Sequence, residues 1–384
     1  MSVTAAHGFR AAGVAAGLKS TGEPDIAVVV NDGPTRSAAA VFTSNRCKAN
    51  PVIWSEQAIK GGTATAVAIN SGGANCYTGS EGFTTTHRTA ELVAERLGVG
   101  AVEIQICSTG LIGLLNDRDA VLGGVGSAID VLSADAGHAA ATAIMTTDSV
   151  AKEAVAHGSG GWTVGGMAKG AGMLAPALAT MLVVVTTDAE VDSAAVDAAL
   201  RTATAQTFDR LDSDGCQSTN DTVLLMASGA SGIAPDLAEF TQAVTAVCRD
   251  LALQLLADAE GADHEIAIEV VNAATVDDAL EVGRSVARSN LFKCAIFGKD
   301  PNWGRILASV GTTQAAFDPG DLDVALNDVW VCRGSGPGES PDMIDLTDRA
   351  VSVTIDLKSG DQSGTIWTND LTQAYVHENS AYSS

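Results

Sequence analysis

A threonine closes a glycine-rich segment near the middle of the chain. The segment reads GGMAKGAGMLAPALAT from Gly165 to Thr180, and the apolar run Met181 to Val185 follows it. If the chain cleaves itself between Ala179 and Thr180, the new N-terminal threonine carries both a hydroxyl and a free α-amino group. A nucleophile and its base then belong to one residue, which is one of the arrangements that activate a hydroxyl for acyl transfer.

The same segment permits two other interpretations. It is predicted to be a flexible loop, and it could be an ordinary turn in which Pro176 sets an extended approach and Thr180 opens a strand. Its glycines could also cradle a phosphate, but their spacing matches neither G-x-x-x-x-G-K-[ST] nor G-x-G-x-x-G. The residues of this segment alone leave the turn and the self-cleavage site open.

A second candidate is the tripeptide Ser108-Thr109-Gly110, which follows a run rich in β-branched residues. A glycine lets the backbone N–H approach a ligand closely, and a neighbouring hydroxyl can donate as well. Together the two groups could stabilise a developing oxyanion. Taken alone, a Ser-Thr-Gly sequence is more typical of a simple turn.

Two polar segments further along the chain have weaker signals. The segment 212–221, DSDGCQSTND, resembles a calcium loop but lacks the glycine at position six and the glutamate at position twelve. The segment 297–305, FGKDPNWGR, places turn-forming residues beside an aromatic ring and two cations. It is interpreted as either a structured functional loop or a bare turn.

Strands and helices alternate along the chain, which predicts a mixed α and β fold. The expected strands are 26–30, 37–43, 63–70, 104–107, 181–185 and 265–271. The expected helices are 84–97, 134–146, 193–206, 235–258 and 277–289, with Pro235 in the first turn of the fourth. The run 181–185 is continuous and apolar, as in a strand covered on both faces. No composition boundary divides the chain, so its one natural division is the proposed cut.

Composition and charge exclude several classes of function. The net charge of −24 over 384 residues repels phosphate backbones, so no nucleic-acid partner is expected. Hydrophobic residues form 46% of the chain, but no apolar run reaches the roughly 20 residues of a spanning helix, and no signal peptide opens it. The seven cysteines are scattered, as are the six histidines, which predicts reduced thiols, no metal and a cytoplasmic location.

Several of these segments, taken in order, resemble the ornithine acetyltransferases, also called the bifunctional glutamate N-acetyltransferases of arginine biosynthesis. The resemblance runs nearly from end to end of the chain. It rests on GFRAAGVAAGLK near the start, VFTSNRCKANPV at 41–52, NSGGANCYTG at 70–79, STGLIG at 108–113, IMTTD at 144–148, KGAGMLAPALATML at 169–182, STND at 218–221, EGA at 260–262, FGKDPNWGRI at 297–306 and the terminal HENSAYSS.

The resemblance implies a role for each candidate residue. Thr180 attacks the carbonyl of Ala179, the chain separates into 1–179 and 180–384, and both fragments build one catalytic unit. The freed threonine then carries the acetyl group from N2-acetylornithine to glutamate, with Thr109 and Gly110 as the oxyanion hole. The residues expected to hold substrate are Thr146 or Thr147, Lys169, Thr180, Glu260, Asn379 and Ser384.

Charge agrees with two of these implied roles. An α-amino acid's carboxylate favours a cation such as Lys169, and ornithine's side-chain ammonium favours a carboxylate such as Glu260. Three features depart from the family's usual pattern, namely the terminal Ser384 in place of threonine, Gly73 with Tyr77 in the 70–79 loop, and the 212–221 loop. These departures bear on substrate preference and leave the reaction class unchanged.

The implied fold is that of the N-terminal-nucleophile enzymes and related self-cleaving aminopeptidases, layered helix, sheet, sheet, helix, with two copies of each fragment in an α2β2 assembly. The resemblance implies no cofactor, and acetyl-CoA is a possible second acetyl donor. Two alternatives remain. One is a self-cleaving aminopeptidase or amidase in which water accepts the acyl group, and the other is an uncleaved protein that binds an amino acid without chemistry.

Overall fold

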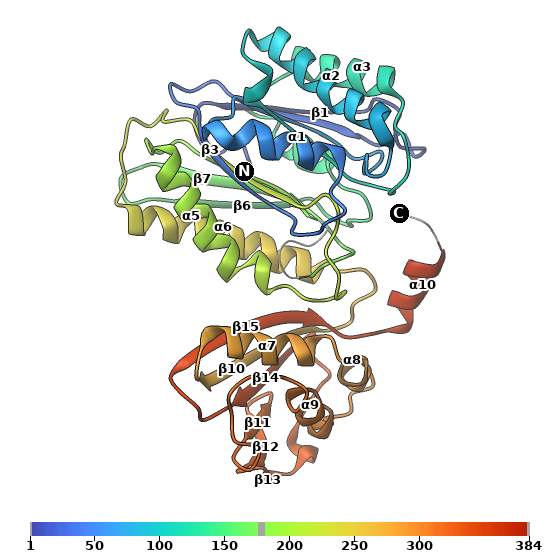
Figure 1. Cartoon of the computed structure of the whole chain (residues 1–384), viewed down its shortest axis with the longest axis vertical. Coiled ribbons are helices and arrows are strands. Elements are labelled where there is room, and N and C mark those ends of the chain that lie inside the picture. Colours follow the sequence, from blue (N-terminus) through green and yellow to red (C-terminus); the bar gives the residue numbers. More distant parts are fainter. Residues whose placement is uncertain (1, 176–180, 382–384) are drawn as a thin grey trace.

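The computed structural model describes residues 2–175 and 181–381, so Ala179, Thr180 and Ser384 lie outside the described residues. Two sheets lie face to face in the upper part of the molecule, and a third sheet forms the lower part (Figure 1). Among the described helices, none combines the length and the apolar character that a membrane crossing requires.

The first sheet has the strand order β1-β2-β4-β5, in which only β4 and β5 run parallel. Its strands are β1 (Phe9–Val14), β2 (Ile26–Asn31), β4 (Ala66–Asn70) and β5 (Ile104–Ser108). In β2, Ile26, Val28 and Val30 pack toward outer helices, while Ala27 and Val29 pack toward the second sheet. Both faces of β2 are therefore buried, which explains its continuous apolar run.

The second sheet has the order β3-β9-β8-β7-β6, and only β8 and β9 run parallel. Its strands are β3 (Ser37–Phe42), β6 (Lys152–His157), β7 (Thr163–Lys169), β8 (Leu182–Thr187) and β9 (Thr222–Ala227). Leu182 and Val184 face the first sheet, whereas Val183 and Val185 face the outer helices. The prediction of a doubly covered strand after Thr180 is confirmed.

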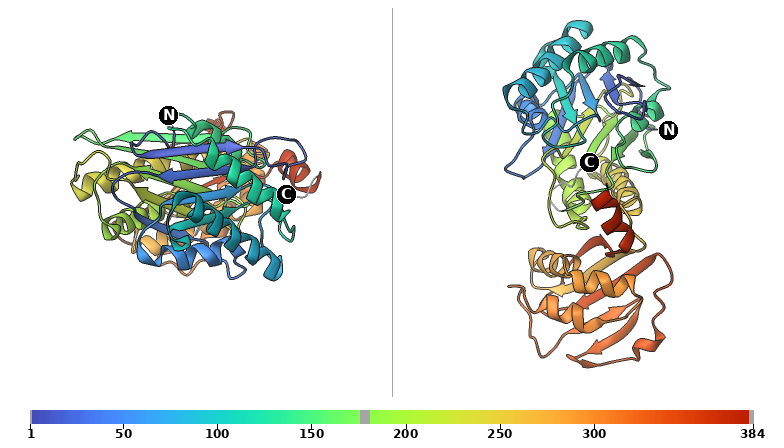
Figure 2. Two further views of the ribbon diagram at one scale, coloured as in Figure 1. Left: turned by 90° about the horizontal axis from the view of Figure 1, so that it is seen from above. Right: turned by 90° about the vertical axis from the view of Figure 1, so that its right-hand side faces the viewer.

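Helices cover the outer faces of both sheets (Figure 2). Those on the first sheet are α1 (Asn50–Ala58), α2 (Gly79–Leu97) and α3 (Arg118–Asp130), and those on the second are α5 (Ser193–Gln206) and α6 (Leu237–Ala257). The short helix α4 (Gly137–Ala143) packs into the core between the sheets. The helix, sheet, sheet, helix order expected from the resemblance is confirmed.

The third sheet has the order β13-β12-β11-β14-β10-β15 and its own apolar core. It contains β10 (Glu265–Ala273), β11 (Asp323–Leu326), β12 (Val329–Arg333), β13 (Gly336–Pro337), β14 (Ala350–Asp356) and β15 (Gln362–Asn369), covered by α7 (Val276–Ala287), α8 (Asn290–Phe297) and α9 (Trp303–Val310). The last helix, α10 (Gln373–Ala381), leaves this sheet and returns toward the layered part (Figure 2).

The expected elements are found with shifted ends. Helix α5 has its predicted bounds, whereas α2 begins at Gly79 instead of Thr84 and α4 is shorter than the expected 134–146. The prediction that Pro235 lies in the first turn of α6 is wrong. Asp236 is the N-cap and accepts hydrogen bonds from the N–H groups of Ala238 and Glu239, so Pro235 precedes the helix.

The prediction of a loop from 165 onward is also wrong in part. Residues up to Lys169 form the buried strand β7, which pairs with β6 and β8. A Cβ on Gly165 would lie 2.4 Å from the Ser2 carbonyl oxygen, and one on Gly166 would lie 3.0 Å from side chains of Val247 and Leu251. These two glycines therefore permit close packing on both faces of the strand.

Candidate active site

One cavity lies where the two facing sheets, the end of α6 and helix α10 meet. It contains about 420 Å³ of empty space, part of which is open to solvent. Nine residues line it, namely Thr109, Gly110, Thr146, Thr147, Lys169, Gly172, Met173, Glu260 and Asn379. The structure thus brings together seven residues named from the sequence, although they come from five separate segments.

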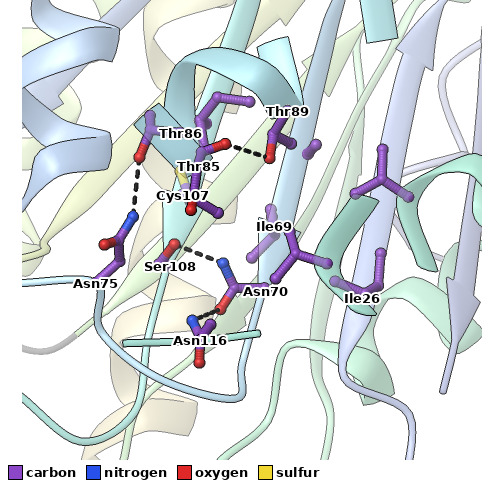
Figure 3. Close-up of a pocket in the computed structure, with 14 residues that line it drawn as sticks. Ile26, Ile69, Asn70, Asn75, Thr85, Thr86, Thr89, Cys107, Ser108 and Asn116 are labelled. Carbon is purple, nitrogen blue, oxygen red and sulfur yellow. Dashed lines mark hydrogen bonds between the residues drawn. The ribbon is translucent and has the colours of Figure 1, made fainter. Parts of the chain in front are cut away.

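The Thr109–Gly110 turn follows directly after β5. The Thr109 N–H donates to the Asn70 carbonyl at 2.9 Å, and the Asn70 amide donates to the Ser108 hydroxyl at 2.6 Å (Figure 3). Gly110 has φ of +123°, and a Cβ there would lie 2.9 Å from the Gly73 Cα. Only glycine suits this backbone conformation and this close approach.

The cavity drawn in Figure 3 lies behind this turn, between the first sheet and its outer helices. Within it, the Asn116 amide donates to the Asn70 side-chain oxygen at 3.1 Å. This polar network supports the ends of β4 and β5 from the side opposite to the candidate site.

Lys169, the last residue of β7, is 2% exposed and points its ammonium at two threonines. Its Nζ donates to the Thr146 hydroxyl at 2.7 Å and to the Thr109 hydroxyl at 3.3 Å. Burial lowers the pKa of Lys169, and the nearby Asp148 carboxylate opposes that shift. The ammonium therefore lies between the oxyanion candidate and the 146–147 segment.

Asp148 is a residue that sequence reasoning missed. Its carboxylate accepts from the backbone N–H of Gly170 at 2.6 Å and of Thr146 at 2.9 Å, and it lies 3.9 Å from the Lys169 Nζ. Lys152 contacts the same carboxylate at 2.7 Å. Burial alone would raise the pKa of Asp148, but the ammonium groups of Lys169 and Lys152 outweigh it and lower the pKa to about 2.

The sequence signal for Asp148 was present but not specific. It ends the segment IMTTD, and Lys152 follows four residues later. Neither the spacing nor the residue type shows that this carboxylate is buried beside the ammonium groups of Lys152 and Lys169. Only the fold establishes that Asp148 fixes the backbone on both sides of the cavity.

Glu260 follows α6 and lies opposite Thr147, whose hydroxyl donates to the Glu260 carboxylate at 2.7 Å. The Glu260 N–H donates to the Ala171 carbonyl at 2.9 Å. A Cβ on Gly172 would lie 2.8 Å from the Glu260 carboxylate, so the glycine makes room for it. Gly172 and the neighbouring Met173 were not named as site residues from the sequence.

Asn379 reaches the cavity from α10. The Tyr375 hydroxyl on the same helix donates to the Asp214 carboxylate at 2.8 Å, and the Thr372 hydroxyl, just before the helix, donates to the Gly261 carbonyl. Burial raises the pKa of Asp214. These contacts hold α10 beside the layered part of the molecule.

The two weaker candidates have other roles. Residues 297–305 span the end of α8, the turn that follows it and the start of α9, and none of them lines the cavity. The 212–221 segment is mostly buried and anchors its surroundings, as in the ion pair of Asp212 with Arg288 at 2.8 Å. Within residues 2–175 and 181–381, no group of three or more His, Cys, Asp or Glu side chains could hold a metal ion.

This arrangement suits recognition of a zwitterionic small molecule. A buried ammonium and a carboxylate lie on the lining of one small cavity, and a glycine turn with a neighbouring hydroxyl lies beside the ammonium. Opposite charges at fixed positions select a ligand by the spacing of its own charged groups.

The model of the ArgJ family matches residues 10–384. The chain belongs to the ArgJ family. It is 61% identical over 384 residues to the arginine biosynthesis bifunctional protein ArgJ of Streptomyces coelicolor and 62% identical to that of Streptomyces avermitilis, with full coverage of both chains in each case.

A solved structure of ornithine acetyltransferase complexed with ornithine, from Mycobacterium tuberculosis, is 50% identical in sequence. It covers 47% of this chain and 96% of its own, with a TM-score of 0.45. The resemblance inferred from the ordered sequence segments is confirmed, and the chain is an enzyme of the ArgJ family.

Proposed function

We propose that this ArgJ family enzyme moves an acetyl group from N2-acetyl-L-ornithine to L-glutamate, giving L-ornithine and N-acetyl-L-glutamate in arginine biosynthesis. One observation carries the proposal. Lys169, Glu260 and the Thr109–Gly110 turn, which are far apart in the sequence, line a single cavity. The names of its close relatives and the ornithine complex of the M. tuberculosis enzyme support the same substrate class.

The first step is self-processing. The Thr180 hydroxyl attacks the Ala179 carbonyl, an ester replaces the peptide bond, and water then hydrolyses the ester to leave a carboxylate on Ala179 and an α-amino group on Thr180. The reference pKa of an α-amino group is about 7.7 to 8. A substantial fraction is therefore neutral near pH 7 and available as a base.

The second step is acetyl transfer in two halves. The Thr180 hydroxyl attacks the acetyl carbonyl, the N–C bond breaks, and ornithine leaves with the proton. Glutamate's amino group then attacks the acetyl-threonine ester and restores the hydroxyl. In both halves, the Gly110 N–H and the Thr109 hydroxyl stabilise the developing oxyanion, which is the largest catalytic contribution expected from this site.

Lys169 binds the substrate's α-carboxylate, and Glu260, held by Thr147, faces ornithine's side-chain ammonium. Asn379 and Ser384 complete the substrate site from the C-terminal end. We further propose an α2β2 assembly of the two fragments, action in the cytoplasm, and acetyl-CoA as a second acetyl donor. No cofactor takes part in these steps.

Processing is tested with Thr180→Ala on a denaturing gel. Wild-type protein is expected to give fragments 1–179 and 180–384, whereas Thr180→Ala stays full length and inactive because it lacks the hydroxyl. Thr180→Ser keeps a hydroxyl and is the matched control, which is expected to cut at a different rate. Cleavage of Thr180→Ala would show that the nucleophile is wrongly assigned.

Transfer is tested by supplying N2-acetylornithine or acetyl-CoA to the processed enzyme, with and without glutamate. We expect N-acetylglutamate to form from acetylornithine only when glutamate is present. Acetate release that does not depend on glutamate would instead support a hydrolase. Product formation from acetyl-CoA would establish the second donor.

A further inference from the structure

The segment Ser218-Thr219-Asn220-Asp221 precedes β9 and lies between the two facing sheets. Asn220 is 3% exposed and Asp221 is fully buried. None of the four residues lines the candidate site. Polar side chains this deeply buried need partners, so the groups that they contact indicate what the segment does.

Asn220 joins two pieces of backbone near the oxyanion turn. Its amide nitrogen donates to the Ser108 carbonyl at 2.8 Å and to the Ala74 carbonyl at 2.6 Å. The Thr219 hydroxyl donates to the Asn220 side-chain oxygen at 2.5 Å, which fixes the orientation of the amide. The Ser108 carbonyl belongs to the peptide unit that carries the Thr109 N–H, so this contact bears directly on the turn.

Asp221 holds the start of β8. Its carboxylate accepts from the Met181 N–H at 3.2 Å, and the following residue, Thr222, donates its N–H to the Met181 carbonyl at 3.1 Å. Met181 is covalently joined to Thr180, the proposed nucleophile. Burial raises the pKa of Asp221 well above its usual range.

We infer that Asn220 is a positioning residue for the Thr109–Gly110 turn. Asp221, the next residue, holds the start of β8, so the pair fixes the distance between that turn and the start of β8. This inference rests on the proposed function. Two consecutive residues thereby link the oxyanion donors to the residue that follows the nucleophile. Displacing a reacting group by about 1 Å costs on the order of 100-fold in rate, so the link affects the chemical step more than substrate binding.

The test compares Asn220→Ala with Asn31→Ala in the processed enzyme. Asn31 is a matched control, because it is fully buried and donates to two carbonyls, those of Thr35 and Ala227, both at 3.1 Å. It lies at the end of β2 away from Asn70. We expect similar losses of thermal stability, but a kcat about 10- to 100-fold lower for Asn220→Ala, with KM within about threefold.

A milder variant keeps the test decisive if Asn220→Ala does not fold. Thr219→Val keeps the shape but releases the Asn220 amide, and we expect kcat to fall about 3- to 10-fold with KM unchanged. Equal kcat values for Thr219→Val and wild type, or for Asn220→Ala and Asn31→Ala, would overturn the inference. A wild-type enzyme that neither cuts nor transfers acetyl would overturn the proposed function instead.

Discussion

At the scale of single residues, the candidate site depends on a small balanced set of buried charges. Lys152 and Lys169 face Asp148, and Lys152 also contacts Asp258 at 2.5 Å. Only Lys169 among these four lines the cavity. Substituting Lys169 therefore tests substrate binding, whereas substituting Lys152 tests structural support.

We predict that Lys169→Met raises the KM for acetylornithine and for glutamate by about 10- to 100-fold, because a charge-assisted hydrogen bond to the α-carboxylate is lost. Steady-state kinetics measure this change. Lys152→Met is the control, since it removes a buried ammonium from the same carboxylate without touching the cavity. It should lower thermal stability and leave KM near the wild-type value, and an equal KM change in both variants would contradict the assignment.

Asp148 gives a prediction on pH. Its pKa is lowered to about 2, below the ordinary value of 3.8, so the ionised form stabilises the fold above pH 4 and that contribution is lost as pH falls toward 2. The difference between the ordinary and the lowered pKa of Asp148 corresponds to about 2 kcal/mol of unfolding free energy. Urea denaturation across this range should show the loss in wild type and not in Asp148→Asn.

Asp212 supplies a control of opposite sign. Burial raises its pKa to about 6 despite the pairing with Arg288, so the folded state binds a proton that the unfolded state releases between pH 4 and 6. The free energy of unfolding that Asp212 contributes therefore decreases as pH rises from about 4 to 6. A difference in unfolding free energy between wild type and Asp212→Asn that stayed constant between pH 4 and 6 would contradict this account.

At the scale of elements, strand β7 shows why a glycine-rich sequence can be rigid. Gly165 faces the Ser2 backbone and Gly166 faces α6. Glycine is common in turns, so the sequence predicts a loop here. A strand glycine can instead mark a place where another segment approaches closely, and the sequence does not show that approach.

We predict that Gly165→Ala destabilises the protein by about 1 to 3 kcal/mol, because its methyl group would meet backbone that cannot rotate away. Gly123→Ala is the matched control, since Gly123 is exposed within α3 and a Cβ there meets nothing within 4 Å. It should stabilise by about 0.5 to 1 kcal/mol through helix propensity. Denaturant unfolding measures both, and a neutral Gly165→Ala would disprove the packing argument.

Much of the layered fold could be predicted from the sequence. Doubly buried strands such as β2 and β8 have continuous apolar runs, and α5 has a clear helical period. The third sheet beyond β10 was not predicted. Strands β11, β12 and β13 have only four, five and two residues, and β10 pairs with β14 and β15, which lie far along the sequence. The lining residues came from family resemblance, whereas Asp148 and Asn220 became visible only once their burial was known.

At the scale of the whole molecule, the cavity depends on a helix that arrives from the third sheet. Helix α10 is held by the Tyr375 hydroxyl on Asp214, and a Cβ on Gly261 would lie 2.2 Å from the Tyr375 N. Asn379 lies one turn further along the helix. Its position in the cavity therefore follows from how the two parts of the molecule dock.

We predict that Tyr375→Phe raises KM about 3- to 10-fold with little change in kcat, because α10 loses a hydrogen bond that aligns Asn379. Kinetics with varied acetylornithine measure the effect. Tyr77→Phe is the control, because Tyr77 is 72% exposed and lies outside the cavity lining. A loss of kcat without a rise in KM would argue against a binding role for α10.

The second sheet joins strands from both sides of the proposed cut. β7 pairs with β8, and β3 pairs with β9, so segments before Ala179 are hydrogen-bonded to segments after Thr180 along two strand boundaries. Before processing, these strands find each other within one molecule. After processing, unfolding would release two separate polypeptides, so refolding would become a second-order reaction and the melting temperature would rise with protein concentration. Self-cleavage would thereby make the stability of the enzyme depend on its concentration, whereas the stability of the uncut chain does not.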